Sequence, residues 1–268
     1  MHFPMTIHLF GFKIPPHPVF ETLAYVIGFT MHITIRCRRN EFSEPHSQIR
    51  VLAILLGCLT GALVGARLLA DIQWLPLLWR HGTTIDWFEN KTIVGGLIGG
   101  WIGVEVAKKL LGMGVGIRSS IGDTMVFPPI VAMAVGRIGC FLTGLSDGTC
   151  GSRTTLPWGV NFGDGVYRHP TQIYDMVFLT LLGLTFLAFR QKFTTPGYLF
   201  RTFIFAYMCY RFLVDFLKPQ PWTMLGMTPI QIGCLGVAGF VAVTCAPALL
   251  ARWSAKIPRA AMTEPVNG

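Results

Sequence analysis

Long apolar stretches recur along the whole chain, and the short segments between them carry most of the charged residues. Each stretch approaches the ~20 mostly apolar residues that a helix needs to cross the hydrocarbon core of a bilayer. Spanning helices are expected over residues 19–35, 51–69, 93–111, 121–141, 173–189, 198–217 and 229–251. The third and fourth stretches are the least uniform, because both are rich in glycine and Pro128 and Pro129 interrupt the fourth. The pattern predicts an all-α polytopic membrane protein with about seven transmembrane helices.

Composition supports a membrane environment for the entire chain. Hydrophobic residues make up 52% of the 268 positions and charged residues only 13%, whereas soluble domains carry about 25% charged residues. The chain is therefore expected to form a single membrane domain, 1–268, with its core at 19–251. The net charge of +9 would suit a nucleic-acid partner. The basic residues, however, sit in short clusters between apolar stretches, as in cytoplasmic loops, so we expect a bilayer and no nucleic acid.

Lysine and arginine are distributed unevenly between the connecting segments, and cytoplasmic loops carry an excess of both. With the N-terminus outside, thirteen of the twenty-two fall inside: Arg36, Arg38, Arg39, Arg50, Lys108, Lys109, Arg118, Arg190, Lys192, Arg201, Arg252, Lys256 and Arg259. Six fall outside: Lys13, Arg80, Lys91, Arg153, Arg168 and Lys218. The remaining three, Arg67, Arg137 and Arg211, lie at or within predicted spans. We therefore expect an outer N-terminus, a periplasmic loop over the site at 143–172, and a cytoplasmic tail at 252–268.

Glycines recur four residues apart in the second and third stretches. Small residues at this spacing let helix backbones approach closely in lipid. The simpler interpretation is tight packing within one chain, and dimerisation through the same faces is the alternative. The glycines concerned are Gly57, Gly61, Gly65, Gly95, Gly99 and Gly103.

Two arginines inside apolar stretches are the first candidates for chemistry, because charges in a membrane interior are costly and face a partner or a cavity. Arg137 has no carboxylate within four residues. Arg211 is followed by Asp215 and Lys218 on one helical face, so a plain ion pair with Asp215 is the structural alternative there. Two such arginines near one leaflet could hold a phosphate, which guanidinium groups grip bidentately.

The outer loop ends in a dense run of polar residues, HPTQIYD, where the fifth stretch begins. His169 opens this run, and Gln172, Tyr174 and Asp175 follow it. A histidine there could act as a general base toward a thiol or hydroxyl, and a structural role carries equal weight. The seven cysteines form no CxxC pair, so no disulfide framework, metal site or cofactor is expected.

The motifs around these residues resemble one family. Arg137 lies in GRIGCFLTG, His169 in HPTQIYD and Arg211 in YRFLVDFLKPQ, in an order and spacing similar to the prolipoprotein diacylglyceryl transferases of bacteria. Asp123, the VGGLIGG segment and the YVIGF segment also fall in register. The resemblance extends from about residue 19 to residue 250.

The resemblance implies a multi-pass, seven-helix enzyme of the bacterial inner membrane. Such an enzyme transfers the diacylglyceryl group of phosphatidylglycerol to a cysteine thiol in the signal peptide of a preprolipoprotein and releases glycerol phosphate. The residues implied to be catalytic are Arg137, His169 and Arg211. Those implied to bind substrate are Gly95, Gly96, Gly136, Gly139, Gly148, Gln172, Tyr174 and Asp215.

The sequence departs from the family at several motif positions. Val94 stands where a histidine is usual, Cys140 and Thr143 replace two asparagines, and Leu145 replaces a glutamate. Glu21 corresponds to a tyrosine. His169, Asp147 or Glu21 would then have to supply acid–base chemistry. Two alternatives stay open: a related membrane transferase with another acceptor, and a non-catalytic phospholipid-binding homologue.

Overall fold

The computed structural model describes residues 3–9, 12–39, 45–81, 91–113, 121–220 and 222–254, and most of them are helical. The helices are α1 (Pro16–Arg38), α2 (Pro45–His81), α3 (Ile93–Leu110), α4 (Ile121–Thr124), α5 (Phe127–Thr143), α6 (Thr171–Ala188), α7 (Tyr198–Asp215) and α8 (Pro229–Ser254), with 3-10 turns η1 (Gly144–Asp147) and η2 (Arg190–Lys192). Two antiparallel hairpins pair β1 (Ile7–Leu9) with β2 (Phe12–Ile14) and β3 (Val160–Asn161) with β4 (Tyr167–Arg168).

Every predicted apolar stretch contains a helix, and the fourth is broken in two. Residues 125–126 separate α4 from α5, and prolines occupy the first turn of α5, where a missing backbone N–H costs no intrahelical hydrogen bond. The Asp123 carboxylate accepts backbone N–H bonds from Gly197 at 2.7 Å and Phe200 at 3.0 Å. The break therefore places α4 beside the start of α7, and Asp123 caps α7.

Four segments of the described chain are long and apolar enough to cross a membrane: Pro16–Arg38, Gln48–Pro76, Gly122–Asp147 and Thr171–Ala188. Pro229–Cys245 is a shorter apolar helix. Large apolar side chains on the bundle surface are widely exposed, among them Phe29 at 60%, Leu59 at 57% and Leu181 at 58%. Lipid satisfies such a surface, whereas water would not. The prediction of an all-α protein with several membrane-spanning helices is confirmed.

The glycine faces of α2 and α3 pack against each other. A Cβ placed on Gly61 would lie 2.2 Å from the carbonyl oxygen of Gly99, and one on Gly103 would lie 1.9 Å from that of Gly57. Both distances are far inside van der Waals contact, so only glycine permits this backbone approach. The glycine repeat is used for packing within one chain, as the simpler interpretation predicted.

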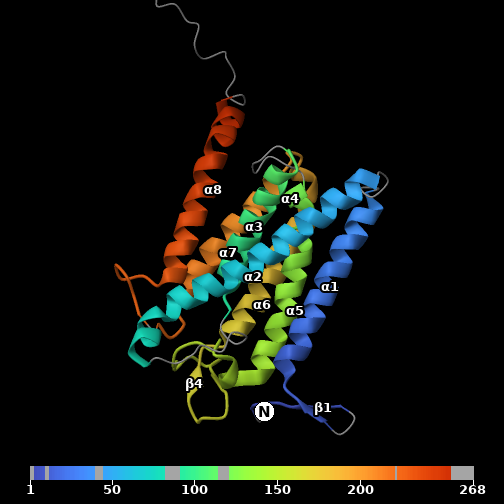
Figure 1. The fold of residues 1–268 in the computed structure, drawn as a ribbon. Coiled ribbons are helices and arrows are strands. Elements are labelled where there is room, and N and C mark those ends of the chain that lie inside the picture. Colours follow the sequence, from blue (N-terminus) through green and yellow to red (C-terminus); the bar gives the residue numbers. More distant parts are fainter. Residues whose placement is uncertain are drawn as a thin grey trace, which may run out of the picture.

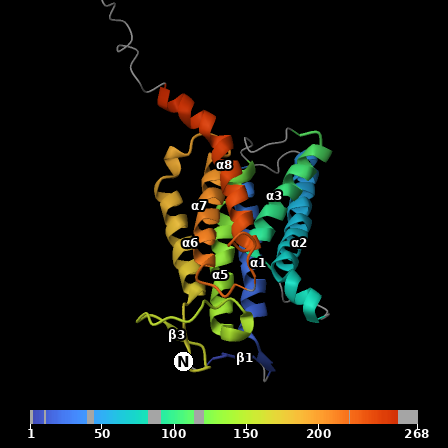
Figure 2. The same cartoon turned by 90° about the vertical axis from the view of Figure 1, so that its left-hand side faces the viewer.

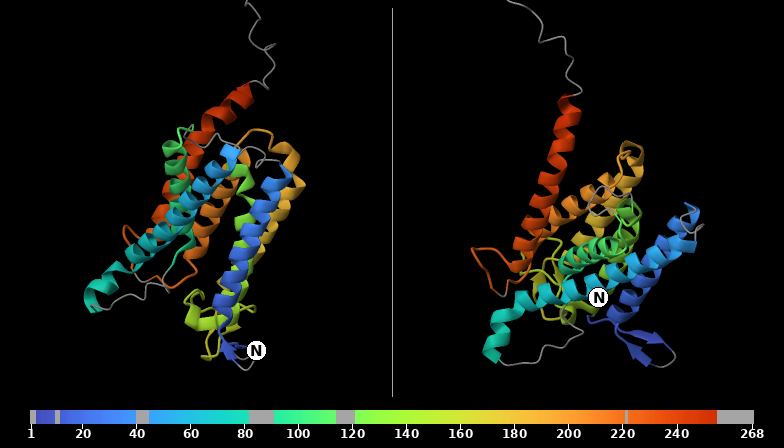
Figure 3. Two further views of the ribbon diagram at one scale, coloured as in Figure 1. Left: turned by 45° about the vertical axis from the view of Figure 1, so that its right-hand side comes forward. Right: turned by 45° about the horizontal axis from the view of Figure 1, so that its top comes forward.

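Most of the helices run side by side with their long axes roughly aligned, and α2 crosses them obliquely (Figures 1 and 2). The two hairpins lie at one end of the bundle, together with the N-terminal part of the chain, η1 and the start of α6 (Figure 1). The last turns of α8 lie at the opposite end, and two further views give the same arrangement (Figure 3). The segments that carry the candidate residues lie at the hairpin end, which we call the outer end because the charge distribution predicts that it faces outward.

Candidate active site

Arg137 is buried in α5 and is held by a carboxylate from α6. Its Nε lies 2.7 Å from Oδ2 of Asp175, and the two side chains are only 8% and 3% exposed. The Tyr210 hydroxyl of α7 donates a hydrogen bond of 2.8 Å to the other oxygen of Asp175. Three helices thus meet around one charged pair, in which one carboxylate oxygen lies against Arg137 and the other accepts from Tyr210. Arg137 is the cationic centre of this cluster.

Arg211 of α7 lies near the same carboxylate and has hydrogen-bonding capacity to spare. Its Nη2 is 3.7 Å from Asp215, so the predicted pairing is present but loose. Asp215 also accepts a bond of 2.5 Å from the Thr228 hydroxyl. Nε and Nη1 of Arg211 are buried and have no hydrogen-bond partner among the described residues. Buried guanidinium donors without partners are costly, and an anion would satisfy them.

Lys218 adds a third cation to this end of α7. It is partly buried just beyond the helix and interacts electrostatically with Arg211, Arg137 and Asp175. Burial, reinforced by the two arginines, lowers the pKa of the Lys218 ammonium to about 7. Its charge is therefore sensitive to pH in the physiological range. With Arg137 and Arg211 it makes the outer end strongly attractive to anions.

The outer loop is tied to the start of α6 by Gln172 and Thr171, both fully buried. The Gln172 amide donates to the Thr149 hydroxyl at 3.1 Å, and the Thr171 hydroxyl donates to the Thr149 carbonyl at 2.6 Å. The backbone N–H of Gly151 donates to the carbonyl of His169 at 2.9 Å. These bonds fix the loop against the start of α6.

His169 contacts Tyr174 at the start of α6, and Tyr174 in turn contacts Trp158 of the loop. The Nδ1 of His169 lies 3.3 Å from the Tyr174 hydroxyl, which accepts a bond of 2.8 Å from the Trp158 indole. The structure therefore brings His169 and Tyr174 together at the outer end. The side-chain contact of His169 within the described part of the chain is with Tyr174, and neither arginine is bonded to the imidazole.

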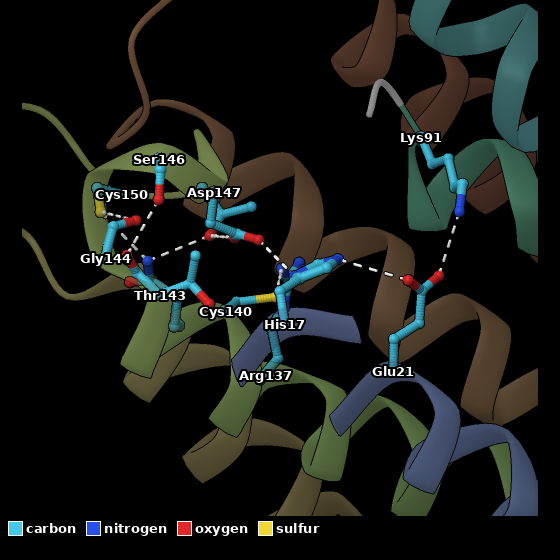
Figure 4. Close-up of polar contacts among 12 residues, drawn as sticks. His17, Glu21, Lys91, Arg137, Cys140, Thr143, Gly144, Ser146, Asp147 and Cys150 are labelled. Atoms are coloured by element: carbon cyan, nitrogen blue, oxygen red, sulfur yellow. Dashed lines mark hydrogen bonds and ion pairs between the residues drawn. The ribbon is translucent and has the colours of Figure 1, made fainter. Parts of the chain in front are cut away.

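A second polar cluster, which we call the His17 cluster, joins α1 to α5 and η1. His17 Nδ1 lies 2.6 Å from Oδ1 of Asp147 and 3.9 Å from Sγ of Cys140. His17 Nε2 lies 3.6 Å from Glu21, whose other oxygen is 3.3 Å from Lys91. Figure 4 shows the imidazole between the Asp147 and Glu21 carboxylates. Arg137 Nη1 reaches Cys140 Sγ at 3.6 Å, so this cluster adjoins the arginine centre.

The glycines predicted to bind substrate lie in different settings. A Cβ on Gly139 would lie 2.6 Å from that of Phe20, and one on Gly95 would lie 2.2 Å from the Gly65 carbonyl oxygen, so both permit close helix packing. Gly136 has looser surroundings, with Ala24 at 3.8 Å. Gly148 ends η1 with φ of 67°, a conformation that favours glycine. For Gly96 the nearest atoms are those of α2 at 3.7 Å. Binding of substrate by any of them stays a prediction.

A family model described as prolipoprotein diacylglyceryl transferase matches residues 4–249, nearly the whole chain. The chain belongs to the prolipoprotein diacylglyceryl transferase family. Among similar proteins, the phosphatidylglycerol–prolipoprotein diacylglyceryl transferase of Clostridioides difficile is 30% identical over 238 residues, covering 86% of this chain and 90% of its own. Proteins of the same name from Geobacter sulfurreducens (30% identical; 80% and 83% covered) and Clostridium tetani (28% identical; 81% and 86% covered) also match.

Two of the positions at which this chain departs from the motifs of the family hold apolar residues. Val94 is 1% exposed inside the main hydrophobic core, and Leu145 is 38% exposed on η1. Neither can take or give a proton. Another departure, Cys140, instead joins the His17 cluster.

Sequence reasoning missed His17 and the role of Asp175. His17 sits in the proline-flanked segment before the first predicted span, where no local motif marks it. Asp175 was named only as part of a polar run, because its partner Arg137 lies 38 residues earlier in the chain. Only the packing of α1 and α6 against α5 brings these residues together.

Proposed function

We propose that this chain transfers the diacylglyceryl group of phosphatidylglycerol to a cysteine thiol of a prolipoprotein and releases glycerol phosphate. Its membership in the transferase family and the names of its relatives support this reaction. The observation that carries it is Arg211, with two buried N–H donors that have no partner within the described chain, near the buried Arg137. Near the end of a spanning helix, where Arg211 lies, the anion that a membrane supplies is a lipid phosphate.

The reaction is a displacement at the C3 carbon of the glycerol backbone. The acceptor sulfur forms the new C–S bond while the bond from C3 to the phosphate oxygen breaks, and glycerol phosphate leaves with the electron pair. Arg137 and Arg211 are proposed to hold the phosphate and absorb the charge that develops on it, as fixed cations do most effectively in a dry site. The thiol proton is proposed to pass to His169, which lies on the loop at the outer end.

The membrane topology that we propose for the chain follows from the distribution of lysine and arginine. Seven spanning helices, an outer N-terminus and an inner C-terminus place Arg137, His169 and Arg211 at the periplasmic side of the bacterial inner membrane. The loop at 143–172 then covers the site, where Gln172, Tyr174, Asp215 and Gly148 would contact substrate or hold the groups that do.

Complementation tests the proposal directly. Cells depleted of their own diacylglyceryl transferase should mature lipoproteins again when they express this chain, and should fail to do so with Arg137→Ala at equal membrane abundance. If the chain changes the membrane lipids but leaves lipoproteins immature, it transfers the group to another acceptor. If it binds phosphatidylglycerol without any turnover, it is a non-catalytic homologue.

A further inference from the structure

His17, Cys140 and Asp147 bring three different metal-ligating atoms together outside the arginine centre. The imidazole Nδ1, the thiol Sγ and a carboxylate oxygen lie within 4.8 Å of one another. They come from α1, α5 and η1, so the fold and not a local turn assembles them. Within the described part of the chain, no fourth His, Cys, Asp or Glu joins the group.

The spacing of these atoms fits a tetrahedral metal ion. Zinc binds nitrogen and oxygen at about 2.0–2.2 Å and sulfur at about 2.3 Å, which places tetrahedral donors roughly 3.3–3.6 Å apart. The observed separations from His17 Nδ1 are 2.6 Å to Asp147 Oδ1 and 3.9 Å to Cys140 Sγ. These two values bracket the tetrahedral spacing, and the third separation, from Cys140 Sγ to the Asp147 carboxylate, is no more than 4.8 Å. A mixed nitrogen, oxygen and sulfur donor set is also one that zinc accepts readily.

Each of the three residues has the outer partner that metal ligands in proteins usually have. Glu21 lies 3.6 Å from Nε2 of His17, the ring nitrogen that would not bind the metal. Lys91 and the Tyr25 hydroxyl in turn contact the Glu21 carboxylate. The Thr149 hydroxyl donates to the Asp147 carboxylate. Arg137 lies 3.6 Å from the Cys140 sulfur, where its positive charge favours the thiolate that a metal needs. Figure 4 shows the ring of His17 with Nδ1 and Nε2 facing the two different carboxylates.

We propose that His17, Cys140 and Asp147 bind a zinc-class divalent metal ion, whose fourth position takes the acceptor cysteine. Three protein ligands with one open position are the arrangement of catalytic zinc sites. A thiol that coordinates the ion is deprotonated outright, and His169 takes up the proton. The thiolate then attacks C3 of the lipid beside Arg137. The role of the metal rests on the proposed function, whereas the binding of the metal does not. The proposal departs from the expectation that the chain needs no metal.

Metal content tests the site without any assay of activity. The full-length protein, purified in detergent and stripped with chelator, is loaded with Zn²⁺ or Co²⁺ and freed of excess metal. Wild type should retain stoichiometric zinc, and its cobalt form should show thiolate-to-metal charge-transfer absorption. Cys140→Ser and Asp147→Asn should lose both, and Glu21→Gln should bind zinc about 10–100-fold more weakly. Cys150→Ser is the matched control, because Cys150 is buried nearby but bonds to the Gly144 carbonyl instead.

The possible results test the metal site and the transferase reaction independently. A wild type that retains no zinc, or a Cys140→Ser variant that retains as much as wild type, would overturn the site. Elution profile and thermal unfolding in the same detergent show whether a variant that lost zinc is still folded. Full transfer activity in metal-free wild type would overturn the role of the metal while the transferase function stands. If the protein binds zinc but transfers no diacylglyceryl group, the metal site stands and the proposed transferase function is wrong.

Discussion

Replacing Arg211 by lysine keeps the charge but removes the planar group that the structure presents to an anion. Nε and Nη1 of Arg211 are buried and have no partner among the described residues, while Nη2 faces Asp215 at 3.7 Å. A lysine ammonium is a point charge on a flexible stem and cannot place donors at both guanidinium positions. The Arg211→Lys variant should therefore fold normally and bind the phosphate poorly.

The magnitude follows from the two N–H donors. A hydrogen bond to a charged group contributes about 1.5–3 kcal/mol, and lysine can replace one of the two. The net loss of one bond corresponds to roughly a 10- to 150-fold fall in kcat/KM, since about 1.4 kcal/mol is a factor of ten. Loss of both bonds would square that factor.

The assay measures kcat/KM with phosphatidylglycerol in mixed micelles and a lipobox peptide as acceptor. Arg201→Lys is the matched control, because Arg201 is a buried arginine of the same helix near its opposite end. The control should lose less than a few-fold. Equal losses in the two variants, or an unchanged Arg211→Lys enzyme, would refute the assignment of Arg211 to the phosphate.

Three further changes have defined outcomes. Asp175→Asn leaves Arg137 unpaired in a buried site and should destabilise the protein by about 3–5 kcal/mol, measured by unfolding in detergent; an unchanged midpoint would contradict the pairing. Lys218 loses its charge as pH rises through its lowered pKa of about 7, while the lipid phosphate stays anionic. Phosphatidylglycerol affinity should therefore fall across that range in wild type and stay flat in Lys218→Met; parallel pH curves would exclude Lys218. Gly61→Leu should unfold or misassemble the bundle, because its Cβ would lie 2.2 Å from a backbone oxygen of α3; Gly236→Leu, with open space around it, should fold normally and serves as the control in a membrane-expression assay.

The positions of the helices could be predicted because apolar length is a strong local signal. Each of the seven stretches contains a helix. The ends lie within three residues of those expected, except that α2 begins six residues before its predicted stretch and ends twelve residues after it. The break between α4 and α5 was harder to place. Pro128 and Pro129 marked an irregularity, but only the capping of α7 by Asp123 explains why the chain bends there.

The residues of the candidate site could be predicted only where a charged side chain lies in an apolar stretch, because burying that charge costs free energy. Arg137 and Arg211 stand out in apolar surroundings, so both were found from the sequence. His17 does not stand out, because a histidine beside prolines at the edge of a span is unremarkable. Its partners Cys140 and Asp147 lie more than a hundred residues away in the chain, and pairings of that kind depend on helix packing that no local pattern encodes.

The most direct test of the central claim is the product of the purified protein. Incubated with phosphatidylglycerol and a lipobox peptide, wild type should give a peptide whose cysteine carries a diacylglyceryl thioether, together with an equal amount of glycerol phosphate. Arg137→Ala should give neither when the two proteins are compared at equal amounts of folded protein. If wild type yields no lipidated peptide under conditions in which the Clostridioides difficile relative does, the proposed transfer to a lipoprotein thiol is wrong.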